Sequence, residues 1–197
     1  MSNFNLPVLP HALERLAARP IEVNSILSLG AGAGDDSVAM LRKWPNAGLL
    51  LIEMDDRFEA DFKKLGSKHP RVRYEICAAA GEDRDGLQIK SDQFGGAIVQ
   101  ADSAQAANAK PVKFRRLDSL VRDHNLEGPY FLKFDTHGAE LDILAGAGEI
   151  LANTSLIMME VYNFKLRFMD FKNLTFDEMS LHMKELGFRC VDMCDPL

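Results

Sequence analysis

Cysteine is scarce in this chain of 197 residues, which contains only Cys77, Cys190 and Cys194. Three widely placed cysteines imply no disulfide framework. The pair Cys190 and Cys194 has no second pair with which to complete a zinc site. We therefore expect reduced, buried thiols in a cytosolic protein.

Long apolar runs and an excess of basic residues are also missing. No stretch approaches the ~18 apolar residues of a membrane-spanning helix. The first twenty residues contain Pro7, Pro10 and Pro20 and no long apolar segment, so no signal peptide is expected. The net charge of −6 argues against a nucleic-acid backbone as the main partner. We predict a cytoplasmic protein that binds neither membranes nor nucleic acids.

Short apolar runs alternate along the chain with segments of helical spacing, and the length fits one domain. The expected strands are Ser25–Leu29, Gly48–Glu53, Val72–Cys77, Leu87–Lys90, Val112–Arg115, Tyr130–Phe134, Leu156–Val161 and Phe188–Met193. The expected helices are Pro10–Arg19, Asp35–Lys43, one from about Phe58 to Gly66, Leu117–Arg122, His137–Leu151 and one from Phe176 to Leu186. This alternation predicts an α/β fold with a mostly parallel, doubly wound sheet and helices on both faces.

The middle of the chain is less regular. The motif GEDRDG at Gly81–Gly86 predicts a turn. The alanine-rich stretch Gln100–Lys110 has no apolar periodicity. It fits either a loop or weak surface helix, or a substrate lid that orders on binding.

A run of alternate glycines, Gly30, Gly32 and Gly34, follows the first expected strand and precedes a helix. The first glycine permits a sharp turn, and the second lets the backbone approach a ligand without a Cβ in the way. Asp35, Asp36 or Ser37 could cap the helix. About twenty residues on, a second apolar strand ends in Glu53, where an acid can accept hydrogen bonds from both ribose hydroxyls. Loop, spacing and acid together favour an adenosine-bearing ligand over a simple tight turn.

Ligands of such sheets bind outside the carboxyl ends of the strands. This rule selects the glycine loop, Glu53, Ala78–Gly81, Asp135–Gly138 and Glu160–Asn163. We expect these segments to lie along one edge of the sheet.

The segment FLKFDTHGAELDILAGAGEIL, Phe131–Leu151, resembles the FkbM family of S-adenosylmethionine-dependent methyltransferases. The hallmark of that family is a strand reading roughly Ile-Lys-Ile-Asp, two variable residues, Gly, a variable residue, Glu and an apolar helix. Lys133, Asp135, Gly138 and Glu140 match it. Further similar segments follow the family's order: SLGAGAGD for the cofactor loop, LLLIEMDDRF for the ribose-binding acid, RRLDSLV for a Thr-Leu-Asp-Asp-Leu element, and LIMMEV for the strand before the variable region.

The resemblance implies a Rossmann-like class I methyltransferase fold that binds S-adenosyl-L-methionine. The methionine part would lie on the glycine loop, the ribose on Glu53, and the adenine near Met54 and Ala78–Ala80. The implied cofactor-binding residues are Gly30, Ala31, Gly32, Gly34, Glu53, Met54, Ala79 and Asp135. The resemblance also implies an oxygen acceptor, such as a hydroxyl of a sugar or a small natural-product-like molecule.

Asp135, His137 and Glu160 are the candidate catalytic residues on the acceptor side. A hydroxyl that attacks a sulfonium methyl must lose its proton at or near the transition state, and imidazole is the usual proton acceptor at neutral pH. Glu160 could orient the acceptor or join Asp135 and His137 around a divalent cation. Because nothing fixes the ligand spacing, no metal is predicted. Asp135 as a helix cap and His137 as a partly exposed first-turn residue stay open as structural alternatives.

Two features depart from the family. The family usually has Asp two residues before the first glycine, where it helps to hold the amino group of the cofactor; this chain has Ser28. The chain also stops at Leu197, where similar proteins continue into a last antiparallel strand. We expect one domain over residues 1–197, with 1–22 as a helical extension and that final strand missing. Either the sequence ends early, or the sheet has an open edge.

Two rival functions remain. One is a nicotinamide-dependent oxidoreductase, although the GxGxG spacing differs from the GxGxxG of such enzymes. The other is a non-catalytic member that binds cofactor or only a partner protein, as Ser28 and the short C-terminus suggest. The expected partner is a small-molecule hydroxyl acceptor, and a homo-oligomer is compatible with the sequence.

Overall fold

The structure is a computed structural model that describes residues 8–89, 97–99, 109–165 and 173–194. Its strands are β1 (Ser25–Leu29), β2 (Gly48–Glu53), β3 (Val72–Ile76), β4 (Ala78–Ala79), β5 (Arg84–Ile89), β6 (Ala97–Val99), β7 (Lys110–Arg115), β8 (Tyr130–Phe134) and β9 (Thr154–Met159). Its helices are α1 (Leu9–Ala17), α2 (Asp35–Lys43), the short 3-10 helix η1 (Asp56–Phe58), α3 (Glu59–Lys68), α4 (Leu117–Asp123), α5 (Glu140–Ala145), α6 (Gly148–Leu151) and α7 (Phe176–Glu185).

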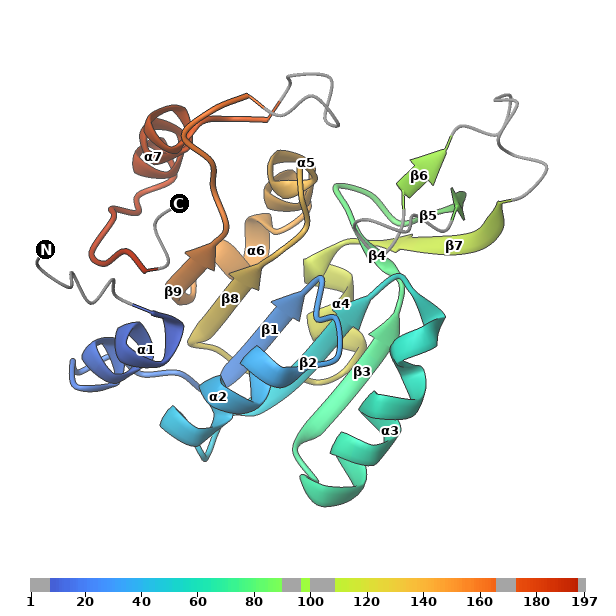
Figure 1. The fold of residues 1–197 in the computed structure, drawn as a ribbon, viewed down its shortest axis with the longest axis horizontal. Helices are drawn as coiled ribbons and strands as arrows, with labels where there is room; N and C mark the ends of the chain where they lie inside the picture. Colours follow the sequence, from blue (N-terminus) through green and yellow to red (C-terminus); the bar gives the residue numbers. More distant parts are fainter. Residues whose placement is uncertain (1–7, 90–96, 100–108, 166–172, 195–197) are drawn as a thin grey trace, which may run out of the picture.

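The central sheet has five parallel strands in the order β3-β2-β1-β8-β9 (Figure 1). Leu29, the last residue of β1, is paired with Ile52 of β2 and with Phe134 of β8. All five residues of β1 are buried, as expected for a strand covered on both faces. The carboxyl ends of these strands therefore reach one common edge of the sheet. The predicted α/β class with a parallel central sheet is confirmed.

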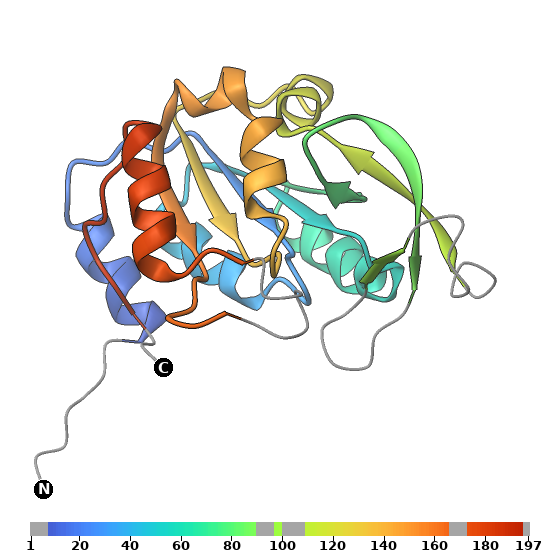
Figure 2. The same cartoon turned by 90° about the horizontal axis from the view of Figure 1, so that it is seen from above.

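Helices cover both faces of the central sheet (Figure 2). On one face, α1, α2 and α3 pack in a core cluster that joins Phe62 to Ile26 of β1. On the other face, α4, α5 and α6 pack in a cluster that joins Ile143 to Leu27 of β1. Neighbouring residues of one strand thus enter opposite cores, because successive side chains of a strand point to opposite faces.

A second sheet of four strands, in the order β4-β7-β5-β6, lies beside the central one and was not predicted. β5 pairs antiparallel with both β6 and β7, so the doubly wound description holds for the central sheet only. Because β5 begins at Arg84, the turn predicted for Gly81–Gly86 is wrong beyond residue 83. Gly86 makes room for a ring: a Cβ there would lie 2.2 Å from Cε2 of Phe114. The guanidinium of Arg84 stacks on the same ring, 3.7 Å from its centroid.

The single helix predicted for His137–Leu151 is wrong, because the structure has two short helices, α5 and α6, instead. A turn precedes α5, in which Gly138 N and Thr136 Oγ1 donate to the carboxylate of Glu140. Gly146 separates the helices at a close approach, since a Cβ there would lie 2.4 Å from the carbonyl oxygen of Ala80. Contacts with distant segments thus divide a stretch whose local pattern is helical.

The strand predicted at Phe188–Met193 is also wrong: residues 188–194 lie within the described residues and form no strand. The carboxylate of Asp192 instead accepts two hydrogen bonds of 2.8 Å from Arg15 in α1. The same segment is exposed at Cys190, so the expectation of buried thiols fails there. It holds for Cys77, where burial raises the pKa of the thiol to about 12.

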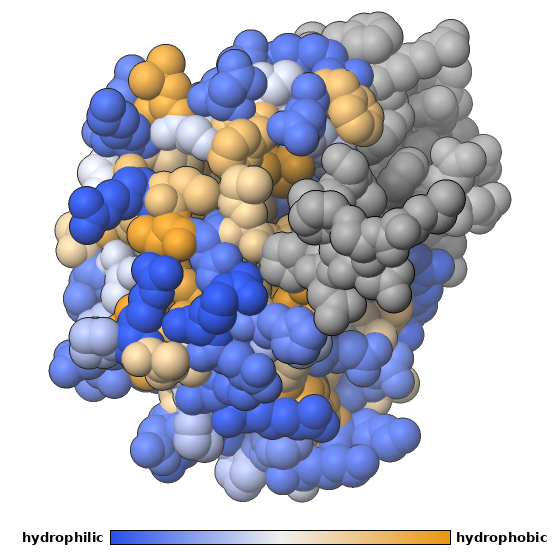
Figure 3. Space-filling view, turned by 60° about the vertical axis from the view of Figure 1, so that its left-hand side comes forward, coloured by the Kyte–Doolittle hydropathy of each residue, from blue (hydrophilic) through white to orange (hydrophobic). Residues whose placement is uncertain are grey.

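The side of the molecule that carries α1 and α7 is mixed in character (Figure 3). Large exposed apolar residues occur in and after α7: Leu181, Leu186, Val191 and Met193. In the coloured part of this view, apolar residues adjoin one another across the upper middle, and hydrophilic residues surround them.

The loop and lid alternatives for Gln100–Lys110 cannot be compared with the structure, because residues 100–108 of this segment lie outside the described residues.

Among the residues that the structure describes, no helix combines the length and the apolar character that crossing a bilayer requires.

Candidate functional site

The glycine loop connects the end of β1 to α2 at the carboxyl edge of the central sheet (Figure 1). Gly30, Gly32 and Gly34 all have positive φ, of 69°, 52° and 88°. These are left-handed conformations that favour glycine. At Gly30 a Cβ would lie only 2.0 Å from the backbone oxygen of Asp135, so the loop touches the residue that follows β8.

Gly32 and Gly34 play different parts. A Cβ at Gly32 would meet no atom within 4 Å, which leaves open space beside the backbone where a ligand can approach closely. Gly34 is the N-cap of α2, and no side chain caps this helix. The expectation that Asp35, Asp36 or Ser37 caps it is therefore wrong. The left-handed conformation of Gly34 excludes the extended backbone of a side-chain cap.

Glu53 ends β2 next to the glycine loop, as the strand-end rule predicts. One carboxylate oxygen accepts a hydrogen bond of 3.0 Å from the backbone N–H of Gly32. The other accepts one of 2.9 Å from the N–H of Asp55. Each carboxylate oxygen has a second lone pair, so these bonds orient Glu53 and still leave acceptor capacity for hydroxyl groups.

Three other predicted cofactor-binding residues are Ala31, Met54 and Ala79. Ala31 is buried, and its backbone is engaged within the protein: its N–H donates to the oxygen of Ile52, and its oxygen accepts from the N–H of Gly34. Met54, directly after Glu53, packs against the small cluster that includes Phe114. Ala79 lies in β4 and is partly exposed. The strand before it is held near Glu53, because Cys77 N donates to the Glu53 backbone oxygen.

Ser28, at the position where the family usually has Asp, is completely buried and accepts a hydrogen bond of 2.9 Å from Ser37. Its neighbour across the β1–β8 pairing is Lys133, which is also buried. The ammonium of Lys133 lies 3.1 Å from a carboxylate oxygen of Asp36 and 2.9 Å from one of Asp135. Asp36 and Asp135 thus supply the negative charge that a buried lysine needs.

Asp135, His137 and Glu160, the predicted catalytic residues, lie together at the same edge. Nε2 of His137 is 3.6 Å from Oδ1 of Asp135, and Nδ1 is 4.0 Å from Oε2 of Glu160. One ligand atom from each of the three residues falls within 4.8 Å of the other two. The structure therefore joins side chains that follow two different strands, β8 and β9.

The structure forms neither the helix cap by Asp135 nor a first-turn position for His137, although His137 is partly exposed as that alternative expected. Asp135 does not cap α5, whose N-cap is Ala139 with no side-chain cap, and it binds Lys133 instead. His137 precedes α5 and has a φ of 47°, which is uncommon for a residue other than glycine. Such conformations persist only where the surroundings enforce them, and they cluster at functional sites.

The two carboxyl groups of the cluster have pKa values that shift in opposite directions. Burial opposes ionisation of Asp135, but the charge of Lys133, together with hydrogen bonds from Glu160 and Lys133, outweighs it and lowers the pKa of this carboxyl. At Glu160, burial and the neighbouring Asp135 raise the pKa, although a hydrogen bond from Tyr162 opposes this. Asp135 is thus the carboxylate that stays ionised as the pH falls, while Glu160 takes up a proton more readily.

Tyr162 also belongs to the cluster, although no role was predicted for it beyond its place in the strand-end segment Glu160–Asn163. Its hydroxyl donates a hydrogen bond of 2.6 Å to Oε1 of Glu160 and lies 3.2 Å from Nδ1 of His137. A tyrosine two residues after a strand-end acid is the available sequence signal, and it is weak. The contact depends on how the chain turns after β9.

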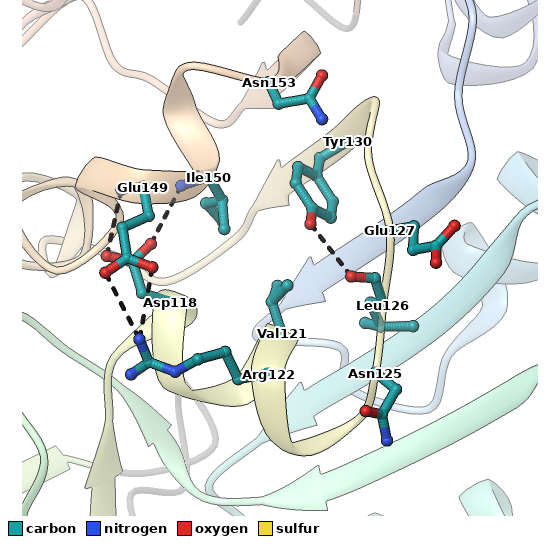
Figure 4. A pocket seen from close by; sticks show the side chains of 10 residues that line it. All are labelled: Asp118, Val121, Arg122, Asn125, Leu126, Glu127, Tyr130, Glu149, Ile150 and Asn153. Carbon is teal, nitrogen blue, oxygen red and sulfur yellow. Dashed lines mark hydrogen bonds and ion pairs between the residues drawn. The ribbon is translucent and has the colours of Figure 1, made fainter.

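A cavity of about 510 Å³ opens elsewhere, at the amino end of β8 (Figure 4). Its lining side chains hold structural elements together. Tyr130 donates to the carbonyl oxygen of Leu126, 3.2 Å away, and the carboxylate of Asp118 accepts bonds from the backbone N–H groups of Glu149 and Ile150 (Figure 4). None of the predicted site residues lines this cavity.

Comparison with known proteins identifies the family. The model described as "Methyltransferase FkbM domain" matches residues 24–190, which include both sides of the site. The chain is also 28% identical over 152 residues to the 2-O-methyltransferase NoeI of Sinorhizobium fredii (strain NBRC 101917 / NGR234). That match covers 68% of this chain, and it spans 62% of the length of NoeI. With most of its length matched, the chain belongs to the methyltransferase FkbM domain family.

Proposed function

We propose that this protein transfers a methyl group from S-adenosyl-L-methionine to a hydroxyl of a small molecule. The observation that carries the proposal is the contact between Gly30 and Asp135. It joins a loop suited to a nucleoside-bearing donor to a cluster suited to removing a proton. The two halves of a methyl transfer thereby meet at one edge of the sheet.

The donor fits the residues at this edge. The open side of Gly32 allows the backbone to contact the methionine part, and Glu53, already oriented by two backbone N–H groups, accepts from the ribose hydroxyls. Met54, which follows Glu53 directly, and Ala79 in β4 are the residues that we assign to the adenine. When bound, S-adenosyl-L-methionine supplies a methyl group activated by a sulfonium. Its amino group cannot rely on an acid at position 28, and we assign that role to the half-exposed carboxylate of Asp36 on α2.

The proton of the acceptor hydroxyl goes to His137 in this proposal. General acid–base help of this kind contributes about 10²–10⁴-fold to rates. Asp135, whose pKa is lowered, stabilises the imidazolium that forms 3.6 Å away. Glu160 orients the acceptor. The family assignment and the similarity to the 2-O-methyltransferase NoeI favour oxygen as the acceptor atom, and we extend this to a hydroxyl on a sugar or a natural-product-like molecule.

Titration calorimetry tests the donor. We expect S-adenosylhomocysteine to release heat with a single site, and NAD(H) to give none. Heat from NAD(H) alone would support the rival oxidoreductase. If S-adenosylhomocysteine binds but no hydroxyl compound is methylated in a broad screen that includes lysate, the non-catalytic alternative is favoured.

Replacing Glu53 with Gln should weaken the binding of S-adenosylhomocysteine about tenfold. The amide keeps an acceptor for the loop but loses the charge that strengthens hydrogen bonds to the ribose, a cost of roughly 1–2 kcal/mol. Calorimetry measures the change. Glu75→Gln removes the same charge from a residue that contacts His124 instead, and should bind normally. Equal affinities of wild type and Glu53→Gln would take Glu53 out of the site.

A second role for the cluster is to hold a divalent cation, which the 4.8 Å grouping of one atom each from Asp135, His137 and Glu160 favours. Such an ion would lower the pKa of a bound hydroxyl. We nevertheless expect turnover to survive dialysis against EDTA, since an imidazole can remove the proton without a metal. Activity lost to EDTA and restored by Mg²⁺ or Mn²⁺ would assign the step to a cation.

A further inference from the structure

Tyr162 is anchored independently of the cluster that it joins. Its backbone oxygen accepts a hydrogen bond of 2.8 Å from the N–H of Phe176, the first residue of α7. Its neighbour across an isolated parallel bridge is Thr175, which caps the same helix together with Glu178. The start of α7 therefore fixes the backbone of Tyr162, and the partly buried hydroxyl reaches back to the strand-end residues.

The direction of the two hydrogen bonds follows from the proton count. A tyrosine hydroxyl has one proton, and a carboxylate offers only acceptors. At 2.6 Å from Oε1 of Glu160, the hydroxyl donates to that group. Burial and this carboxylate both raise the pKa of Tyr162, which keeps the hydroxyl protonated. Toward Nδ1 of His137, 3.2 Å away, the tyrosine oxygen can then only accept.

We propose that Tyr162 is a positioning residue that holds neutral His137 in the tautomer with its proton on Nδ1. The lone pair then lies on Nε2, the nitrogen that faces Asp135. Nε2 is therefore the atom that takes the proton of the acceptor hydroxyl, and the positive charge of the imidazolium lies 3.6 Å from the carboxylate of Asp135. The role of Nε2 as base rests on the proposed methyl transfer, whereas the tautomer does not.

The tautomer can be read without turnover, from long-range ¹H–¹⁵N correlations of the histidine rings in ¹⁵N-labelled protein. Loss of one signal set in His137→Asn identifies His137. We expect the wild type to carry the proton on Nδ1. In Tyr162→Phe the nearest carboxylate oxygen is that of Asp135, beside Nε2, so the proton should move to Nε2. Tyr74→Phe loses a similar tyrosine bond, to Glu59, and should keep the wild-type pattern.

Kinetics give the second readout. Tyr162→Phe should lower kcat about tenfold and leave the KM for the cofactor within about twofold. A wild-type proton on Nε2, or an unchanged pattern in Tyr162→Phe, would overturn the proposal. The wild-type spectrum decides alone if the variant does not fold. If the tautomers behave as expected but no acceptor is methylated by the wild type, the proposed function fails and the positioning by Tyr162 stands.

Discussion

His137→Asn should lower turnover by about 10²–10⁴-fold, the usual contribution of a positioned acid or base. Asparagine cannot take a proton from a hydroxyl at neutral pH. It does tolerate the left-handed backbone that His137 adopts with a φ of 47°, so the turn before α5 should survive. A methylation assay at saturating cofactor measures the loss, and calorimetry with S-adenosylhomocysteine checks that binding is unchanged.

His124→Asn is the matched control for that experiment. Nε2 of His124 lies 3.2 Å from a carboxylate oxygen of Glu75, a contact of the same chemical kind. No residue of the cluster is involved in this contact, and the control should turn over like the wild type. If His137→Asn also retains full turnover, His137 has no part in the mechanism, and the role of Nε2 is withdrawn with it.

Gly32→Leu should weaken the binding of S-adenosylhomocysteine about a hundredfold or more. The position has a φ of 52° and no atom within 4 Å of an added Cβ, so the new side chain would occupy the space that we assign to the cofactor. Backbone strain from a left-handed leucine costs roughly 1–3 kcal/mol of stability but should leave the fold intact. Calorimetry gives the affinity, and thermal unfolding gives the cost of the strain.

Gly187→Leu is the control that distinguishes the effect of backbone strain from the effect of a side chain that blocks the cofactor's space. Gly187 follows α7, has a φ of 91° and likewise has no atom within 4 Å of an added Cβ. The two variants should lose comparable stability, and only Gly32→Leu should lose the ligand. Similar affinities for the two variants would mean that the cofactor does not approach Gly32.

The central sheet could be predicted because its signals are local. β1, α2, β2 and β8 have the predicted bounds, since glycine, proline or a charged residue marks the ends of these elements. The second sheet depends on pairing across a long insertion, and Gly86 reads as a turn residue until Phe114 is placed beside it. The break between α5 and α6 also depends on a contact between distant residues, since no local sequence pattern predicts the approach of Ala80 to Gly146.

Part of the site could likewise be predicted from the sequence and part could not. The strand-end rule predicted that Asp135, His137 and Glu160 lie together, because the carboxyl ends of parallel strands meet at one edge of the sheet. Tyr162 was not predicted, because its backbone is held by Thr175, which lies beyond a long stretch of chain. The pairing of Lys133 with Asp36 was also missed, because it requires the packing of α2 against β8.

A crystal structure of the protein with S-adenosylhomocysteine would show whether the donor binds at the glycine loop. The proposed function predicts the homocysteine backbone against Gly32, the ribose hydroxyls on Glu53, and the sulfur directed toward Asp135, His137 and Glu160. A ligand bound elsewhere, for example in the cavity at the amino end of β8, would contradict it.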